Sequence, residues 1–254
     1  MKTLCPWLIR YSGNDASPIR LFCVHFAGGS ALAFKSWAEY LPDTVELIAI
    51  QLPARDGRYT EPALTDMTQV IAGLIPAIRP YLDKPYIIYG HSLGALIGYE
   101  LIRTINDLRL ASPKLFIASA HRAPHFLARA KPIYTLSDKE FIAKIGRFDG
   151  TSKTVLENEE LMSAFLPRIR SDFQILETYH YQPHAALDTP ILALMGKDDT
   201  HVNETELLGW AQHTQHSFRC HFFEGGHFFI KMAEKELLNV INHECDALAD
   251  YLLT

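Results

Sequence analysis

The chain has 254 residues, of which 48% are hydrophobic and 21% are charged, and this balance is typical of a globular protein with a sizeable core. The formal net charge of −5 and the isoelectric point near 6.2 argue against a nucleic-acid-binding protein. The mean hydropathy is −0.01, and no apolar run approaches the ~18 residues needed to cross a bilayer, so we expect no membrane partner.

The amino-terminal segment and the cysteines both favour a cytoplasmic location. The first apolar run, residues 4–9, contains Pro6 and is ended by Arg10, and no small-residue cleavage site follows it, so we expect no export signal. Four cysteines lie far apart and form no Cys-x-x-Cys pair: Cys5, Cys23, Cys220 and Cys245. We therefore expect no disulfide framework, no metal and no other cofactor. Nothing in the sequence requires more than a monomer.

Short apolar runs recur along the chain and predict strands. The first five are Leu21–Phe26, Val45–Ile50, Tyr86–Tyr89, Leu115–Ala118 and Ile191–Met195. They do not alternate polar with apolar residues, which is the pattern of parallel strands that helices cover on both faces. A sixth run, Phe218–Phe223, includes Arg219 and His221, so we expect it nearer an edge of the sheet.

Helical patterns fill most of the gaps between these runs. They span Ala31–Tyr40, Thr65–Tyr81, Leu93–Asn106, Glu204–Thr214 and Ala233–Leu253. Thr65 and Asp66 are candidate caps of the second segment, and Pro76 predicts a kink or a break in it. The alternation of strands and helices predicts an α/β protein with a mostly parallel, doubly wound sheet, in a single domain over residues 1–254.

One stretch, His121–Pro183, is too long to be a simple crossover between the fourth and fifth predicted strands. It contains two helical segments of its own, near Ser137–Ile145 and near Asn158–Tyr179. We therefore predict a helical insertion that lies over the sheet as a lid.

The strongest local signal is Gly90-His91-Ser92-Leu93-Gly94, a Gly-x-Ser-x-Gly motif between a predicted strand and a predicted helix. This context is that of a nucleophile elbow, in which the glycines permit a tight turn and the serine hydroxyl projects above the sheet. The alternative is a glycine-rich turn with a solvated serine. A catalytic Ser92 would need a base, because a serine hydroxyl alone is a poor nucleophile.

Two later segments supply the candidate base and the carboxylate that orients it. His227 follows two glycines after the last predicted strand, and histidine suits the role because its pKa lies near neutrality. Asp199 follows the fifth strand, with Asp198 as the fallback. The order Ser92, Asp199, His227 is that of the α/β-hydrolases. A structural histidine and a turn-forming aspartate are the alternatives.

The reaction also needs donors for the developing oxyanion. One is the backbone N–H of Leu93, directly after the nucleophile, and our choice for the second is the backbone N–H of Ala27 in the glycine-rich segment 25–30. That segment lacks the glycine and lysine spacing of a nucleotide-binding loop.

Together these residues resemble the type II thioesterases, the stand-alone enzymes that accompany nonribosomal peptide and polyketide synthases. The resemblance runs from about Leu21 to the carboxyl terminus and is carried by Phe26–Ala31, Gln51–Arg55, Gly90–Gly94 and Gly225–His227. The Leu-Pro-x-Arg element in the second segment is the most discriminating, and Arg58 resembles a further basic position of the family. One departure is His25-Phe26, where the family has proline and then histidine or tyrosine; we expect a different pocket wall there.

The resemblance implies hydrolysis of acyl groups from the phosphopantetheine arm of carrier domains, which clears misprimed or stalled synthases. It implies a mobile lid, and residues 121–183 match its place. The alternatives are a carboxylesterase or lipase acting on free small esters, and a binding module that has lost its chemistry.

Two groups of residues in the insertion have open roles. Four phenylalanines belong to the core of the insertion or line an acyl chamber, and we favour the core: Phe126, Phe141, Phe165 and Phe173. Five cations are solvated or meet an acidic carrier domain: Arg122, Arg129, Lys131, Arg168 and Arg170.

Overall fold

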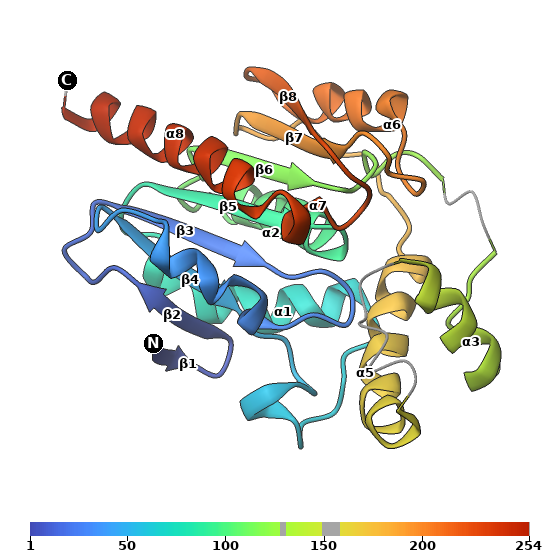
Figure 1. The fold of residues 1–254 in the computed structure, drawn as a ribbon. Coiled ribbons are helices and arrows are strands. Elements are labelled where there is room, and N and C mark those ends of the chain that lie inside the picture. Colours follow the sequence, from blue (N-terminus) through green and yellow to red (C-terminus); the bar gives the residue numbers. More distant parts are fainter. Residues whose placement is uncertain (128–130, 149–157, 254) are drawn as a thin grey trace.

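The computed structural model describes residues 1–127, 131–148 and 158–253. Eight strands form one sheet in the order β1-β2-β4-β3-β5-β6-β7-β8 (Figure 1). The strands are β1 (Lys2–Cys5), β2 (Leu8–Ser12), β3 (Ile19–Val24), β4 (Val45–Ile50), β5 (Tyr86–His91), β6 (Leu115–Ser119), β7 (Ile191–Gly196) and β8 (Phe218–Phe223). Neighbours from β4 to β8 are parallel, whereas β2 is antiparallel to both β1 and β4. The prediction of a mostly parallel sheet is confirmed.

All six predicted strands are present, and β8 lies at the edge of the sheet as predicted. The sequence interpretation missed β1 and β2. These strands are short, Pro6 occupies the turn between them, and β2 is only partly buried, so neither gives a continuous apolar run. Leu8 nevertheless has no exposed surface, because it packs into the core against β4.

Seven described α-helices connect the strands: α1 (Met67–Ile78), α2 (Leu93–Asp107), α3 (Asp138–Ile145), α5 (Glu159–Thr178), α6 (Glu204–Leu208), α7 (Phe229–Met232) and α8 (Glu234–Leu253). Short 3-10 helices span Ala31–Phe34, Ser36–Glu39, Asp56–Arg58, Arg79–Tyr81, Gly146–Phe148 and Gly209–His213. The prediction of one helix over Ala31–Tyr40 is wrong. Phe34 and Trp37 are both fully buried, and a spacing of three residues places them on one side of 3-10 turns.

The predicted break at Pro76 does not occur, since α1 continues to Ile78. The proline lies in the last turn of the helix, where it removes one backbone hydrogen bond without interrupting a long ladder. Asp66 caps the other end of α1, because its side chain accepts from the N–H of Gln69.

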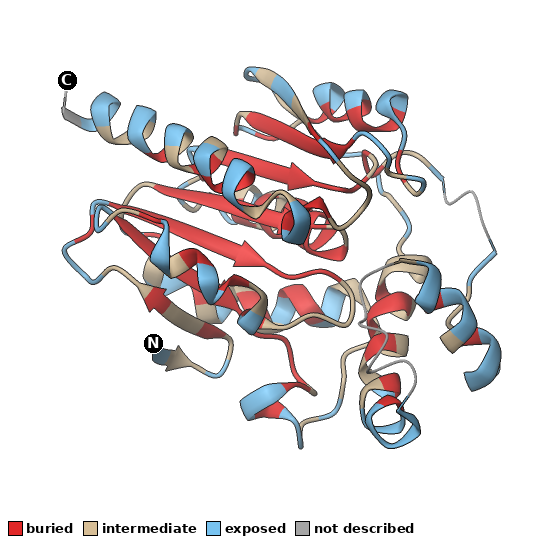
Figure 2. Cartoon of the chain, in the orientation of Figure 1, coloured by how far each residue is buried: buried red, intermediate tan, exposed pale blue. Residues whose placement is uncertain are grey.

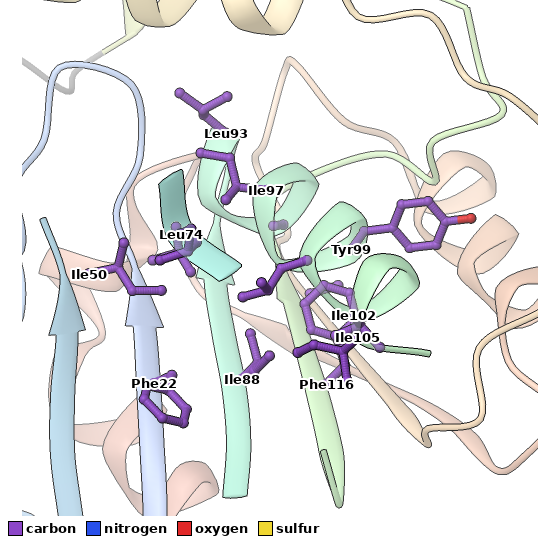
Figure 3. Packing of buried hydrophobic residues seen from close by; sticks show 14 of the residues in the cluster. Phe22, Ile50, Leu74, Ile88, Leu93, Ile97, Tyr99, Ile102, Ile105 and Phe116 are labelled. Carbon is purple, nitrogen blue, oxygen red and sulfur yellow. The ribbon is translucent and has the colours of Figure 1, made fainter. Parts of the chain in front are cut away.

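Hydrophobic clusters cover both faces of the sheet, and Figure 2 shows the central strands buried between helices. Successive strand residues point to opposite faces. Thus Phe22 packs with α1 and α2 on one face (Figure 3), while Leu21 packs on the other with α8 and the 3-10 helices that follow β3. The unbroken apolar runs of the sequence follow from this two-sided burial.

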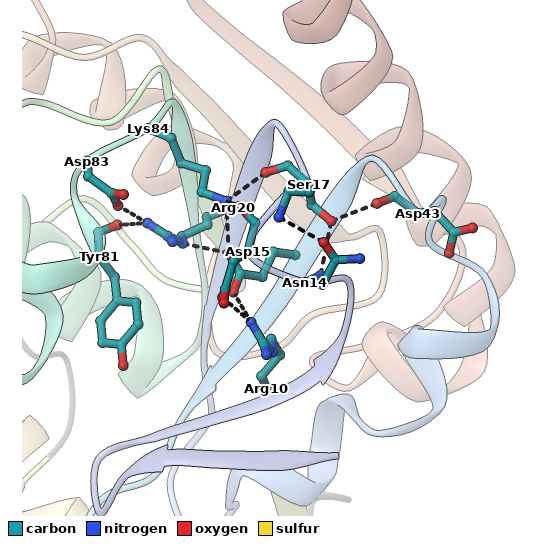
Figure 4. A network of polar contacts seen from close by, with 11 residues as sticks. Arg10, Asn14, Asp15, Ser17, Arg20, Asp43, Tyr81, Asp83 and Lys84 are labelled. Carbon is teal, nitrogen blue, oxygen red and sulfur yellow. Dashed lines mark hydrogen bonds and ion pairs between the residues drawn. The ribbon is translucent and has the colours of Figure 1, made fainter.

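A buried polar network lies at the amino ends of the parallel strands (Figure 4). Glu46, near the start of β4, has a fully buried side chain, and Arg10, Arg20 and Lys84 all lie within ion-pair distance of it. Several cations around one carboxylate offset the cost of removing its charge from water. This network links β2, β3 and β4 at the end of the sheet opposite to Ser92.

The segment between β6 and β7 carries α3 and α5. Figure 1 places both helices beyond the end of the sheet toward which the parallel strands point. They share a small hydrophobic cluster of their own, which includes Phe141, Leu166 and Phe173. Within this insertion, residues 128–130 and 149–157 lie outside the described part of the chain.

Candidate active site

Ser92 lies in a strained turn between β5 and α2. Its φ of 55° and ψ of −118° are rare for a residue with a side chain. The flanking glycines leave no room for a Cβ: one at Gly90 would lie 2.1 Å from the carbonyl oxygen of Gly94, and one at Gly94 would lie 2.1 Å from that of Val24. The main chain of the turn therefore packs directly on β3 and presents the serine at the carboxyl edge of the sheet.

The structure brings Ser92, His227 and Asp199 together from three separate segments. His227 Nε2 lies 3.0 Å from Ser92 Oγ, and His227 Nδ1 lies 2.8 Å from Asp199 Oδ2. A carboxylate can only accept, so Nδ1 carries the proton and Nε2 is free to accept from the serine hydroxyl. Asp199 is the aspartate that contacts His227, while Asp198 is exposed to solvent.

Asp199 is held as a buried anion. Its side chain has no exposed surface, and this burial acts to raise its pKa. The hydrogen bond with His227, and those accepted from the backbone N–H groups of His201 and Val202, outweigh burial and lower the pKa of Asp199 below its ordinary value. The carboxylate is thus charged at neutral pH and can stabilise a positive charge on His227.

The candidate oxyanion donors flank Ser92. Leu93 is the first residue of α2, so its N–H is one of those left without a partner inside the helix. Ala27 lines the same pocket as Ser92 and belongs to a turn in which Gly29 N–H donates to Phe26 O over 2.9 Å. Gly28 has a φ of +75° in this turn, a conformation that favours glycine.

His91 contacts the backbone of His227 and was missed by the sequence interpretation. It is fully buried, with Nε2 3.0 Å from the backbone oxygen of His227 and Nδ1 2.9 Å from Ser119 Oγ. Burial lowers the pKa of His91 well below its ordinary value, so the ring is neutral and donates through Nε2 to the carbonyl of His227. His91 occupies the first variable position of the Gly-x-Ser-x-Gly motif, which gives no sequence signal for this role.

A small apolar pocket opens beside Ser92. The sheet side contributes Phe26, Ala27, Ser92, His227 and Phe228, and the insertion contributes Ile145, Phe148, Ile169, Phe173 and Leu176. Phe26 and Phe228 meet edge to face, with ring centroids 5.0 Å apart. Phe26 is one of the two residues at which the chain departs from the family pattern, and His25 beside it is fully buried.

Three of the four phenylalanines belong to the core of the insertion or pack at its edge, and Phe126 has neither predicted role. Phe173 lines the pocket and also packs in the core of the insertion, where Phe141 is fully buried. Phe165 packs at the edge of that core. Phe126 packs instead against the hydrophobic cluster on the face of the sheet that α1 and α2 cover. The pocket wall and the core of the insertion are therefore one continuous cluster.

Three of the five predicted cations, Arg122, Arg168 and Arg170, make contacts within the chain. Arg170 donates to the carbonyls of Tyr134 and Leu136 and to Asp138, and Arg168 lies over the ring of Phe165, 4.3 Å from its centroid. Arg129 lies outside the described residues. A docking role for these cations stays a prediction. Replacing Arg168 or Arg170 would alter the insertion itself, so such variants would not isolate docking.

Asp172 and Arg55 form a second polar group beside the site. Their side chains are 1% and 2% exposed, and Asp172 Oδ2 accepts from the N–H of Gly28 over 2.7 Å. The sequence carried one signal for Asp172, which occupies the apolar face of α5 between Ile169 and Phe173. A charge in such a position needs a buried partner.

The described helices include none that is both long and apolar enough to span a membrane. In the same part of the chain, no group of three or more His, Cys, Asp or Glu side chains is arranged to hold a metal ion.

The sheet, its order and its flanking helices define the α/β-hydrolase fold, with a serine, a histidine and an aspartate in contact at the carboxyl edge. Comparison with known protein families identifies the family within the α/β-hydrolases. Residues 19–245 match the model of the thioesterase domain, and the chain belongs to this thioesterase family.

Individual relatives cover nearly the whole chain. Gramicidin S biosynthesis protein GrsT of Aneurinibacillus migulanus is 34% identical over 91% of this chain and 91% of its own length. Thioesterase PikA5 of Streptomyces venezuelae is 33% identical over 97% of this chain and 85% of its own. The solved structure of BorB, a type II thioesterase from the borrelidin biosynthetic cluster, superposes with a TM-score of 0.89, at 32% identity over 96% of this chain and all of BorB.

Proposed function

We propose that this protein is a serine thioesterase that removes acyl groups from the phosphopantetheine arms of carrier domains, and so clears misprimed or stalled nonribosomal peptide and polyketide synthases. The observation that carries the proposal is the contact of Ser92 with His227, and of His227 with Asp199, at the mouth of an apolar pocket. Membership of the thioesterase family and the biosynthetic relatives support the choice of a carrier-bound thioester as substrate.

Acylation begins when His227 Nε2 takes the proton of Ser92 and the serine oxygen attacks the thioester carbonyl. The backbone N–H groups of Ala27 and Leu93 hold the oxyanion of the tetrahedral intermediate. Asp199 stabilises the imidazolium. The carbon–sulfur bond then breaks, and His227 gives its proton to the pantetheine sulfur, leaving an acyl ester on Ser92.

Deacylation repeats the sequence with water as the nucleophile. His227 takes a proton from water as the water oxygen attacks the acyl carbon, and the same two N–H groups hold the second oxyanion. The bond from the carbon to Ser92 Oγ breaks, the serine regains its proton from His227, and the free acid leaves. No cofactor takes part in either half.

The proposal includes the part that the insertion plays. Residues 1–254 act as a single domain, and residues 121–183 serve as a lid whose helix α5 supplies one wall of the pocket. The partner is an acyl- or peptidyl-carrier domain, and the enzyme works as a monomer in the cytoplasm.

The deciding experiment is intact-mass spectrometry of an acetyl-loaded carrier domain incubated with and without this protein. We expect loss of the acetyl mass with the pantetheine arm retained, and no loss with the Ser92→Ala variant. A carrier that keeps its acetyl group, together with rapid cleavage of free nitrophenyl esters, would replace the proposal with an esterase. Hydrolysis by Ser92→Ala at the wild-type rate would reject the catalytic assignment.

A further inference from the structure

A buried ion pair joins the lid helix to the segment that follows β4. Arg55 and Asp172 form a two-pronged contact, with Nη2 2.9 Å from Oδ1 and Nη1 2.9 Å from Oδ2. Arg55 also donates through Nε to the carbonyl of Pro53, so its guanidinium has a fixed orientation. The pair is therefore a rigid link between α5 and the body of the protein.

The same pair also holds the turn that carries Ala27. The carboxylate of Asp172 accepts from the N–H of Gly28, and Nη1 of Arg55 donates to the carbonyl of Gly29 over 2.9 Å. The N–H of Gly28 belongs to the peptide group directly after Ala27. Asp172 thus fixes the orientation of that peptide, while the hydrogen bond from Gly29 N–H to Phe26 O fixes the one before it.

The apolar neighbours of Asp172 on α5 meet the same turn and the pocket. A Cβ on Gly28 would lie 3.0 Å from Ile169 Cγ1, so the helix packs closely on the turn. Ile169 and Phe173 also line the pocket beside Ser92. One face of α5 therefore forms the pocket wall and, through Asp172, holds the backbone that provides an oxyanion donor.

We infer that Asp172 is a positioning residue for thioester hydrolysis: paired with Arg55, it orients the Phe26–Gly29 turn so that the Ala27 N–H faces the oxyanion only while α5 is docked. Docking of the lid then completes the pocket and the oxyanion hole in a single step. A buried ion pair contributes little to stability compared with apolar residues of similar size, so its presence here is explained by what it orients. The inference rests on the proposed function.

The first test is the Asp172→Asn variant, measured with the acetyl thioester of N-acetylcysteamine as a small substrate. The amide has the size of the carboxylate but only one accepting oxygen. It accepts either from Gly28 and Nη1 of Arg55 or from Nη2 of Arg55, and in both orientations its NH₂ group faces a donor, so the pair and the turn cannot both keep their contacts. We expect kcat to fall by about 10²-fold, the effect of losing one oxyanion donor, with KM changed less than about twofold. A binding role would instead move KM.

Asp138→Asn is the matched control. Asp138 pairs with Arg170, another arginine–aspartate contact of α5, but this contact joins α5 to α3 and does not touch the turn. We expect its kcat to stay within about twofold of wild type. An equal loss in both variants would mean that any disturbance of the lid slows the reaction, and it would overturn the specific role of Asp172.

A double variant, Arg55→Met with Asp172→Leu, separates positioning from folding. Apolar residues of similar volume replace both charges, so we expect the melting temperature to return close to that of wild type. The Gly28 N–H still lacks its acceptor, so kcat is expected to stay about 10²-fold low. Recovery of kcat together with the melting temperature would show that the pair is only structural.

Failure of this inference is distinguishable from failure of the proposed function. Wild-type protein that leaves both the acetyl-loaded carrier and the small thioester intact overturns both. Wild-type turnover that is lost in Ser92→Ala but fully kept in Asp172→Asn overturns only the role of Asp172. Turnover that is lost in Ser92→Ala, low in Asp172→Asn and unchanged in Asp138→Asn is the expected result.

Discussion

The carboxyl edge of the sheet and the helical insertion meet at the pocket but are built differently. At the sheet edge, main chain packs on main chain, as at Gly90 and Gly94, where a single added carbon would collide with a carbonyl oxygen. The insertion meets the site through side chains, among them Phe148, whose ring stacks on His201 with centroids 4.1 Å apart. The proposed reacting groups thus lie on the part that cannot adjust, and the insertion's side of the pocket wall lies on the part that can.

The sharpest test on the sheet side compares two adjacent aspartates. Asp199→Asn removes the charge that His227 needs and permits the wrong tautomer, so we expect kcat for the acetyl thioester to fall by about 10⁴-fold. Asp198→Asn is the matched control, because Asp198 is exposed, and we expect its kcat to match wild type. Steady-state kinetics at saturating substrate measures both. A large loss at Asp198 and none at Asp199 would reverse the assignment.

A second test asks how little the sheet edge can adjust. Gly94→Ala places a Cβ 2.1 Å from the carbonyl oxygen of Val24, and neither backbone can move far. We expect the free energy of unfolding to fall by about 3 kcal/mol, the upper end of overpacking effects. Gly57→Ala is the control, since a Cβ there meets nothing within 4 Å; we expect it to be neutral or slightly stabilising. Urea unfolding measures the free energy of unfolding of both variants. An equal change in the two would contradict the expectation that the sheet edge cannot adjust.

The contrast also explains which features the sequence could predict. Strands buried on both faces leave unbroken apolar runs, and a tight turn leaves glycines at fixed positions around Ser92, so both are local patterns. Asp199 could be preferred over Asp198 from its spacing after Gly196 alone. The strands β1 and β2 left no such pattern, because partial burial at one edge of the sheet gives short and mixed runs.

The positioning contacts could not be predicted because they join segments far apart in the chain. Arg55 and Asp172 are separated by 117 residues, and His91 and His227 by 136. Arg55 stood out only as part of a family motif, and nothing in the sequence named its partner. The direction in which each side chain points is decided by how α5 packs on the turn, which is a property of the fold.

Acid is expected to destabilise the protein through buried histidines, among them His25 on the sheet side. Burial, aided by the charge of Arg55, lowers the pKa of His25 from its ordinary value of 6.5 to about 4, so the folded protein keeps this ring neutral while the unfolded chain takes up a proton below pH 6.5. Its contribution to stability is complete above pH 6.5 and is lost as the pH falls toward 4. By linkage, we expect about 2 kcal/mol less stability at pH 5 than at pH 7 from this group.

Glu177 of the insertion is expected to change the stability in the opposite direction as the pH falls. Burial raises its pKa, although it accepts from the N–H groups of Ile133 and Tyr134, so acid does not remove stability through this group. Urea unfolding at pH 7 and pH 5 tests the difference. We expect the pH dependence to become shallower in His25→Gln and to remain as steep in Glu177→Gln. A His25→Gln variant with the wild-type pH dependence would contradict the assignment.

The smallest expected effect tests whether the pocket wall can be changed without disturbing the chemistry. Phe173→Leu removes part of an aromatic ring from the pocket while keeping an apolar side chain in the insertion core, so longer acyl chains gain space. We expect the ratio of kcat/KM for a hexanoyl to an acetyl thioester to rise about tenfold, the worth of roughly one methylene in an apolar pocket.

Phe141→Leu is the control for that change. Phe141 is fully buried behind Phe173, with ring centroids 5.5 Å apart, and it does not belong to the described pocket wall. We expect it to lower the melting temperature and to leave the hexanoyl-to-acetyl ratio unchanged. If both variants raise the ratio equally, chain-length preference follows from looseness of the lid as a whole. If only Phe173→Leu raises it, the wall of the insertion sets acyl length independently of the reacting groups on the sheet.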